Sequence, residues 1–174
     1  MAVMTLLPDD DNTVSAHWIP VGETEAWECL DDDNDGTSYV KCALNGEYMV
    51  IEFANPSIAE STITSIDSVR FISSGRSSHR SYVARVTIAY ATPFGNSDET
   101  CNYPASRSDF TSISGTARAH ANGTSGGWSY ANLESLEMKV LKTLAVEVQF
   151  GYLAMEVTYT PAGRDNATFF GTNF

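Results

Sequence analysis

Four aspartates and a glycine lie close together in the segment LDDDNDGTSYV, and their spacing is that of a calcium-binding loop. Asp31, Asp33 and Asp35 take alternate positions ahead of Gly36, as the first ligands of an EF-hand loop do. The twelfth position, which holds a bidentate glutamate in such loops, is Cys42. The strongest ligand is therefore missing, and the residues that follow read as a strand rather than a helix.

Two interpretations of this loop stay open. Carboxylates about 5 Å apart in water repel each other by only about 0.8 kcal/mol per pair, so an acidic surface loop needs no metal. The alternative is a weak calcium site on a β-sandwich loop, with affinity on the order of the millimolar extracellular modules. We therefore expect no cofactor other than weakly bound calcium, held by Asp31, Asp33 and Asp35.

The sequence contains no motif for catalysis. There is no G-x-S-x-G segment and no paired nucleophile and base. His17, His79 and His120 are far apart in sequence and lack the spacing of zinc ligands. The glycine-rich NGTSGGW has no lysine and precedes no long helix, so it is not a phosphate loop. The sequence predicts a protein that is not an enzyme.

Three tryptophans, Trp18, Trp27 and Trp128, are candidate platforms for sugar rings. Jelly-roll folds include many lectin domains, and a flat aromatic ring can stack on the apolar face of a sugar. Tryptophans beside strand segments also pack in cores and at sheet edges. Both roles stay open for each of the three.

The formal net charge of −12 at pH 7 argues against a nucleic acid partner, because phosphates are bound mainly by lysine and arginine. Residues 1–40 contain ten Asp or Glu and no Lys or Arg. Four arginines follow with a single acid, Asp67, nearby: Arg70, Arg76, Arg80 and Arg85. They are either scattered over a solvated surface or form a basic patch that meets the acidic segment of another copy.

Cysteine content and hydropathy indicate a protein synthesised in the cytoplasm. Cys29, Cys42 and Cys101 are an odd number without a C-x-x-C pair, which indicates neither a zinc cluster nor a full disulfide framework. The start MAVMTLLPDDDN lacks a basic segment, and no stretch of the chain could span a bilayer. We expect free thiols and no membrane partner.

Short apolar runs rich in Val, Ile, Tyr and Phe, separated by turn residues, predict strands through most of the chain. TSYVKCAL and EYMVIEFA flank Asn45 and Gly46, which tolerate the positive φ of a type I′ turn, and this predicts a hairpin. One short helix is expected near residues 131–136, with Asn132 as its candidate cap. The fold class predicted is an all-β antiparallel sandwich of jelly-roll type.

The two ends of the chain differ from the middle. We predict an N-terminal arm over residues 1–16, a sandwich over 17–161 and a C-terminal arm over 162–174. Burying a phenylalanine is worth roughly 1.5–3 kcal/mol, so the three in the last segment should fold back or dock on a neighbour. These phenylalanines are Phe169, Phe170 and Phe174. Together with the four arginines named above, they are the predicted interface residues.

LLPDDDNTVSAHWIPVGETEAWECLDDDNDGTSYV combines an apolar-Pro-Asp opening, a Trp, a Gly and an acidic run that ends in Thr-Ser-Tyr. GGWSYANLESLEMKV and the closing YLAMEVTYTP follow in the second half. This order of features, over most of the first 161 residues, resembles a group of tailed-bacteriophage virion proteins with jelly-roll domains. In that group the acidic stretch is a common surface turn, which favours the acidic surface loop over a metal loop.

The resemblance implies a structural role in the virion. The expected function is capsid decoration: a homotrimer bound to the major capsid protein on the outer surface of the shell, cementing it through multivalent contacts. A neck, tail or fibre component is one alternative. A carbohydrate-binding β-sandwich module, with a tryptophan platform and calcium on the aspartate loop, is the other.

Overall fold

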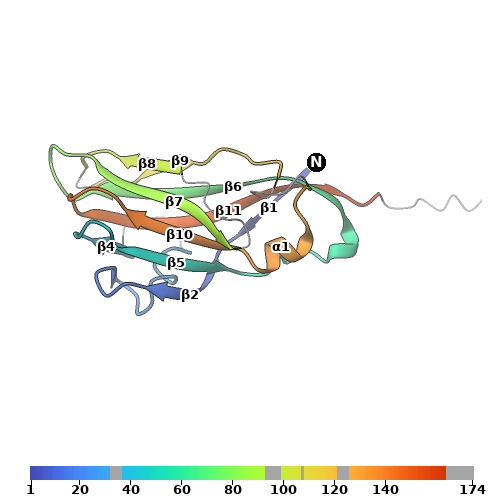
Figure 1. Cartoon of the computed structure of the whole chain (residues 1–174), viewed down its shortest axis with the longest axis horizontal. Coiled ribbons are helices and arrows are strands. Elements are labelled where there is room, and N and C mark those ends of the chain that lie inside the picture. The colour runs from blue at the N-terminus through green and yellow to red at the C-terminus, as the bar shows by residue number, and fades with distance from the viewer. Residues whose placement is uncertain (32–36, 93–98, 107, 121–125, 164–174) are drawn as a thin grey trace, which may run out of the picture.

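The structure is a computed structural model, and it describes residues 1–31, 37–92, 99–106, 108–120 and 126–163 (Figure 1). Two antiparallel β-sheets pack face to face around one hydrophobic core. The predicted all-β sandwich of jelly-roll type is therefore confirmed. No helix among the described residues is long and apolar enough to cross a membrane.

The first sheet has six strands in the order β3-β4-β11-β6-β9, and β1 also pairs with β11. Its strands are β1 (Ala2–Leu6), β3 (Ile19–Val21), β4 (Tyr39–Cys42), β6 (Ile63–Ser77), β9 (Thr111–Ser114) and β11 (Val148–Pro161). The two long strands, β6 and β11, pair from one end of the sheet to the other. They run the length of the molecule in Figure 1.

The second sheet has five strands in the order β2-β5-β10-β7-β8. They are β2 (Pro8–Val14), β5 (Tyr48–Phe53), β7 (Ala84–Thr92), β8 (Glu99–Tyr103) and β10 (Glu137–Lys142). In β10 the side chains of Met138 and Val140 are buried while that of Lys139 between them is partly exposed. This alternation is the period of two that lets one face of a sheet pack on a core.

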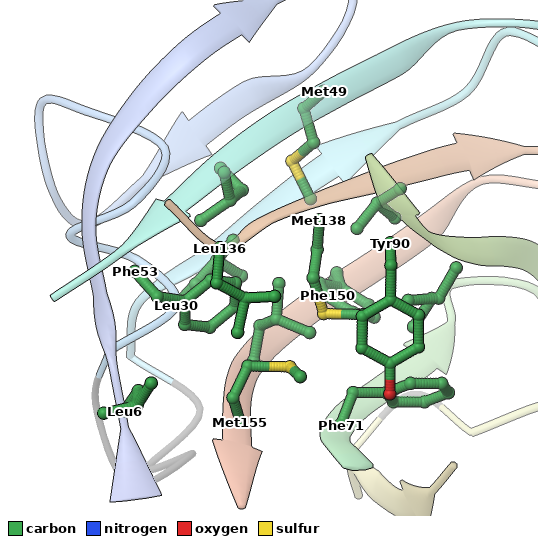
Figure 2. Close-up of a cluster of buried hydrophobic side chains, with 14 of the residues drawn as sticks. Leu6, Leu30, Met49, Phe53, Phe71, Tyr90, Leu136, Met138, Phe150 and Met155 are labelled. Carbon is green, nitrogen blue, oxygen red and sulfur yellow. The ribbon is translucent and has the colours of Figure 1, made fainter. Parts of the chain in front are cut away.

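The core lies between the two sheets, and Figure 2 shows side chains from both of them meeting there. Met49 and Met138 come from the five-stranded sheet, whereas Phe71 and Phe150 come from the six-stranded sheet. Each of these side chains is at most 1% exposed. The sandwich is held by this burial, which is worth roughly 25 cal/mol per Å² of apolar surface.

The N-terminal residues belong to the sandwich, which corrects the prediction of an arm over residues 1–16. β1 pairs with β11, and β2 pairs with β5, so the first fourteen residues contribute a strand to each sheet. Met4 and Leu6 are buried in the core. The aspartates of β2 concealed this strand from sequence reasoning, since an acidic edge strand has little β-propensity.

The predicted hairpin around Asn45 and Gly46 is also wrong. β4 pairs with β3 and β11 in one sheet, whereas β5 pairs with β2 and β10 in the other. The turn itself exists, with Gly46 at a φ of 87°. Its backbone N–H donates to the carbonyl of Lys142 at 2.9 Å, so the turn carries the chain from one sheet to the other.

The helix α1 (Tyr130–Glu134) lies close to the predicted position. Its N-cap is Ser129, whose hydroxyl accepts from the Asn132 N–H, while the Asn132 side chain accepts from the Ser129 N–H. This reciprocal pair is a capping box. Asn132 thus takes part in the cap, from the third helical position rather than from the cap position.

All three cysteines are free and buried in the core. Burial raises the pKa of the Cys29 and Cys42 thiols above the ordinary value, and it raises that of Cys101 to about 11. Because the thiolate is the reactive form, these cysteines are doubly protected, by lack of access and by protonation.

We therefore expect none of the three thiols to react with Ellman's reagent at pH 8 in the folded protein. All three should react in about 6 M guanidinium chloride, which unfolds the protein. The absorbance of the released thionitrobenzoate measures the number of thiols that have reacted. Rapid modification of any thiol without denaturant would contradict the burial of the core.

Two glycines with positive φ allow a matched test of the backbone. Gly22 has a φ of +101°, and a Cβ there would lie 2.7 Å from the Thr37 carbonyl oxygen. Gly46 has a φ of +87° with nothing within 4 Å of such a Cβ. Alanine costs roughly 1–2 kcal/mol for the left-handed conformation at either site, and overlap adds about 1–3 kcal/mol at Gly22 alone.

Gly22→Ala should therefore lower the free energy of unfolding clearly more than Gly46→Ala does. Urea denaturation followed by far-UV circular dichroism measures both variants. Equal losses of unfolding free energy in the two variants would show that the backbone around Thr37 can shift away from a Cβ at position 22 without loss of stability.

Candidate functional site

A surface cavity of about 210 Å³ lies at the end of the sandwich that carries α1. Its walls are the first residues of β6, 63–66, and the segment 128–130 that leads into α1. Glu60, from the short 3-10 helix η1 (Glu60–Thr62), completes the rim. Figure 1 shows α1 and the start of β6 at the same end of the molecule.

Trp128 forms the fixed aromatic wall of this cavity. The residue is 7% exposed, and its backbone forms an isolated antiparallel bridge with Ile66 of β6. Its indole Nε1–H donates to the carbonyl of Arg118 at 2.8 Å. Its ring centroid lies 6.1 Å from that of Tyr90, at an interplanar angle of 58°. The indole therefore has a set orientation before any ligand arrives.

An ion pair behind Trp128 holds the segment that accepts its hydrogen bond. Arg118 Nη2 lies 2.8 Å from Glu99 Oε1, and the other carboxylate oxygen accepts from the Thr116 N–H at 2.9 Å. The guanidinium also lies 5.4 Å from the ring centroid of Tyr90. Burial raises the pKa of the Tyr90 hydroxyl, which therefore stays neutral.

Tyr130 contributes a second aromatic ring, and its hydroxyl is anchored. It is the first residue of α1, and its phenol donates to the Ile58 carbonyl at 2.8 Å. The capping box of Ser129 fixes the helix start and hence the place of this ring. Tyr130 is partly exposed, so part of its side chain can contact a ligand in the cavity.

Polar groups ring the opening. The side chains of Glu60, Thr64 and Ser129 are exposed, and the Ser65 hydroxyl donates to Asp67 at 2.8 Å. Among the described lining residues, Glu60 is the one that carries a charge. The cavity thus combines aromatic and aliphatic walls with hydroxyl and carboxylate oxygens at the rim. Such a site suits a small neutral ligand with both an apolar face and hydroxyl groups.

A second cavity of about 230 Å³ lies on the other side of α1. It is lined by Glu52 and Phe53 of β5 and by residues 134–137. Three of its six lining residues are glutamates, and Glu52 stands directly opposite Glu137 across the β5–β10 ladder. It offers no exposed aromatic ring, so it suits a sugar less well than the first cavity does.

The aspartate loop falls largely outside the described residues. Asp31 is described and partly buried, whereas Asp33 and Asp35 are not among the described residues. No group of three or more His, Cys, Asp or Glu in the described part of the chain could hold a metal. The weak calcium site stays a prediction.

The four arginines of the predicted interface do not share one face. Arg70 pairs with Glu156 at 2.6 Å on the six-stranded sheet. Arg76, on the same sheet, donates to Gln149 at 2.7 Å and lies 4.3 Å from the Phe110 ring centroid. The other two lie elsewhere: Arg80 is exposed in the loop after β6, and Arg85 donates to Asn102 on the five-stranded sheet. Phe169, Phe170 and Phe174 lie outside the described residues.

Of the three candidate tryptophan platforms, Trp18 is 2% exposed and belongs to the core. Trp27 is partly exposed and lines neither cavity. Trp128 alone lines the first cavity, although it too is largely buried. Sequence reasoning missed Glu60 and Tyr130, since only the fold brings η1 beside α1. The one sequence signal for Tyr130 was its place directly before the expected short helix.

Comparison with solved structures supports the fold. A carbohydrate-binding module of lichenase 5A from Cellvibrio mixtus, in complex with cellotriose, is 14% identical, with a TM-score of 0.50 over 91% of this chain and 98% of that chain. The CBM35 of Abf62 from Cellvibrio japonicus is 10% identical, with a TM-score of 0.45 over 93% of this chain and 97% of that chain. No family model and no curated protein matches the sequence. The first likeness shows a shared β-sandwich fold.

The ion pair behind Trp128 makes a prediction about the cavity wall. Glu99→Gln leaves the partly buried guanidinium of Arg118 without its carboxylate, which should cost about 1–3 kcal/mol of unfolding free energy. The tryptophan emission should also shift, because the acceptor of the indole N–H moves. Urea denaturation and steady-state fluorescence measure the two effects.

Glu156→Gln is the matched control, since it breaks the more exposed pair with Arg70 on the other sheet. It should cost less than about 1 kcal/mol and leave the emission spectrum unchanged. An unchanged spectrum in both variants would mean that the Arg118–Glu99 pair does not position Trp128.

Proposed function

We propose that this chain is a non-catalytic carbohydrate-binding domain that holds one neutral sugar residue in the cavity between Trp128, Tyr130 and Glu60. The observation that carries the proposal is the cavity itself, with two anchored aromatic rings beside exposed hydroxyl and carboxylate oxygens. A pyranose has apolar C–H faces and a rim of hydroxyls, so it meets both kinds of surface at once.

The size and charge of the cavity support a neutral, single-ring ligand. About 210 Å³ is below the roughly 300–1,000 Å³ of sites for drug-sized molecules. The described lining has Glu60 and no lysine or arginine. A carboxylate accepts hydrogen bonds from sugar hydroxyls and repels a uronate or a sulfate. The net charge of −12 disfavours anionic polysaccharides further.

Binding without hydrolysis follows from the same lining. Most glycosidases place two carboxyl groups on either side of the scissile bond, roughly 5 to 9.5 Å apart. Glu60 is the single carboxylate among the described residues that line the cavity. The Cellvibrio mixtus module of the same fold is described in complex with cellotriose, which makes neutral glucans the first ligands to test.

The test is isothermal titration calorimetry with neutral oligosaccharides, chosen by screening the full-length protein on a glycan array. Glu60→Gln should weaken the affinity by about tenfold, or about 1.4 kcal/mol, through loss of a charged hydrogen-bond acceptor. Tyr130→Ala should weaken it at least as much, through loss of the ring. Glu60→Gln should unfold at nearly the wild-type temperature because Glu60 is exposed, whereas Tyr130→Ala also loses the hydrogen bond to the Ile58 carbonyl and should unfold at a slightly lower temperature.

Glu134→Gln is the control for location, since Glu134 is exposed on α1 and lines the second cavity. It should leave the affinity unchanged. Loss of affinity in Glu134→Gln alone would move the site to the second cavity. The absence of binding to any neutral glycan at millimolar concentration would refute the proposal.

Capsid decoration is the second candidate, and the order of features shared with phage virion proteins favours it. One sandwich fold serves many functions, so the fold separates neither candidate from the other. The predicted partners under this candidate are the major capsid protein and two further copies, on the outer surface of the virion. Quantitative mass spectrometry of purified particles from the source tests it: a copy number comparable to the major capsid protein is expected, and absence from particles would exclude it.

A further inference from the structure

The end of the sandwich opposite α1 is formed by three neighbouring turns. Residues 43–47, 78–83 and 143–147 lie together there, since Gly46 N–H donates to the Lys142 carbonyl at 2.9 Å and Ser78 N–H to the Glu147 carbonyl at 3.2 Å. In Figure 1 this is the end from which β11 starts, far from α1. We call it the apolar end.

Exposed apolar side chains gather at the apolar end. Eight large hydrophobic residues are exposed in the described part of the chain, and three of them lie on these turns. They are Leu44, Tyr82 and Val83. Tyr82 is the most exposed of the three, at 60%. Grouped apolar residues of this kind mark an interaction surface more often than scattered ones do.

The most exposed ring at the apolar end is held in place. Tyr82 lies 4.5 Å from His79, measured between ring centroids, at an interplanar angle of 43°. His79 is also held by two hydrogen bonds. Its ring Nδ1 accepts from the Ser81 backbone N–H at 3.0 Å, and its backbone N–H donates to Ser77 Oγ at 3.2 Å. A preorganised aromatic pair loses little side-chain entropy on binding.

The charges at the apolar end are self-complementary. Arg80 is exposed and has no acidic partner among the described residues, whereas Glu47 and Glu147 lie in the two adjoining turns. By contrast, Asp9 and Asp10 are exposed on the edge strand β2. With a net charge of −12, two copies repel each other least where a cation is present.

We propose that two copies of this chain associate through the apolar end in an isologous dimer, with Tyr82 and Val83 of each copy packed on the other. A two-fold axis brings the same patch of both copies together, so a patch that contains apolar residues and both signs of charge can bind itself. Arg80 of each copy then faces the glutamates of the other. The cavities beside α1 point outward at the two far ends, and neither is covered.

Sedimentation equilibrium of the full chain from about 1 µM to about 1 mM tests the dimer. The expected mass rises with concentration from 18.9 kDa to twice that value. Tyr82→Asp and Arg80→Glu should each raise the dimer dissociation constant at least tenfold, with unchanged far-UV circular dichroism. The control is Val3→Asp, because Val3 is 58% exposed on β1, away from the apolar end.

A mass of 18.9 kDa at every concentration would overturn the dimer, and so would three times that mass at saturation. Dimerisation that survives Tyr82→Asp and Arg80→Glu but is lost in Val3→Asp would place the contact at β1 instead. None of these outcomes depends on sugar binding, so the dimer and the proposed function stand or fall separately.

Discussion

The pairing of β6 with β11 is the interaction on which the rest of the structure depends. The ladder runs from Ser77 opposite Val148 to Ile63 opposite Pro161, with bulges where the register shifts. Every other strand of the six-stranded sheet attaches directly or through one neighbour to this pair. Since antiparallel strands rise about 3.4 Å per residue, this ladder sets the length of the sandwich and separates its two ends.

Each end of that ladder opens into a different surface. Where β6 begins, Ile63 and Ile66 form one wall of the cavity, and Trp128 joins the sheet by its bridge to Ile66. Where β6 ends, the chain enters the turn that displays His79 and Tyr82. The proposed ligand binding at one end and the proposed self-association at the other are therefore compatible, and a dimer would present two sites to a polymeric glycan. Linked sites of this kind gain avidity without new contacts.

The strands with regular apolar alternation could be predicted from the sequence, because one buried face leaves a period of two that needs no knowledge of partners. Apolar runs of this kind lie within β6, β7 and β11. The partners of β4 and β5 could not be predicted. Asn45 and Gly46 specify a tight turn, but whether the strands on either side pair with each other or enter opposite sheets depends on distant strands, here β10 and β11.

The candidate site was predictable only in part. Trp128 was one of three candidate tryptophan platforms, yet its packing against Arg118 and Tyr90 has no local signal in the sequence. Glu60 is separated from it by 68 positions, and a lone glutamate in a polar loop looks like any solvated charge. The acidic loop had the stronger motif, but Asp33 and Asp35 lie outside the described residues, so its calcium site stays a prediction.

The most direct test of the sugar site is a titration of the ¹⁵N-labelled protein with neutral oligosaccharides, followed by ¹H–¹⁵N correlation spectra. The indole N–H of Trp128 gives a resonance of its own and reports on the cavity wall. We expect this resonance and the backbone amides of residues 60–66 and 128–130 to shift together and to saturate. Shifts confined to the five-stranded sheet, or no shifts up to about 10 mM sugar, would contradict it.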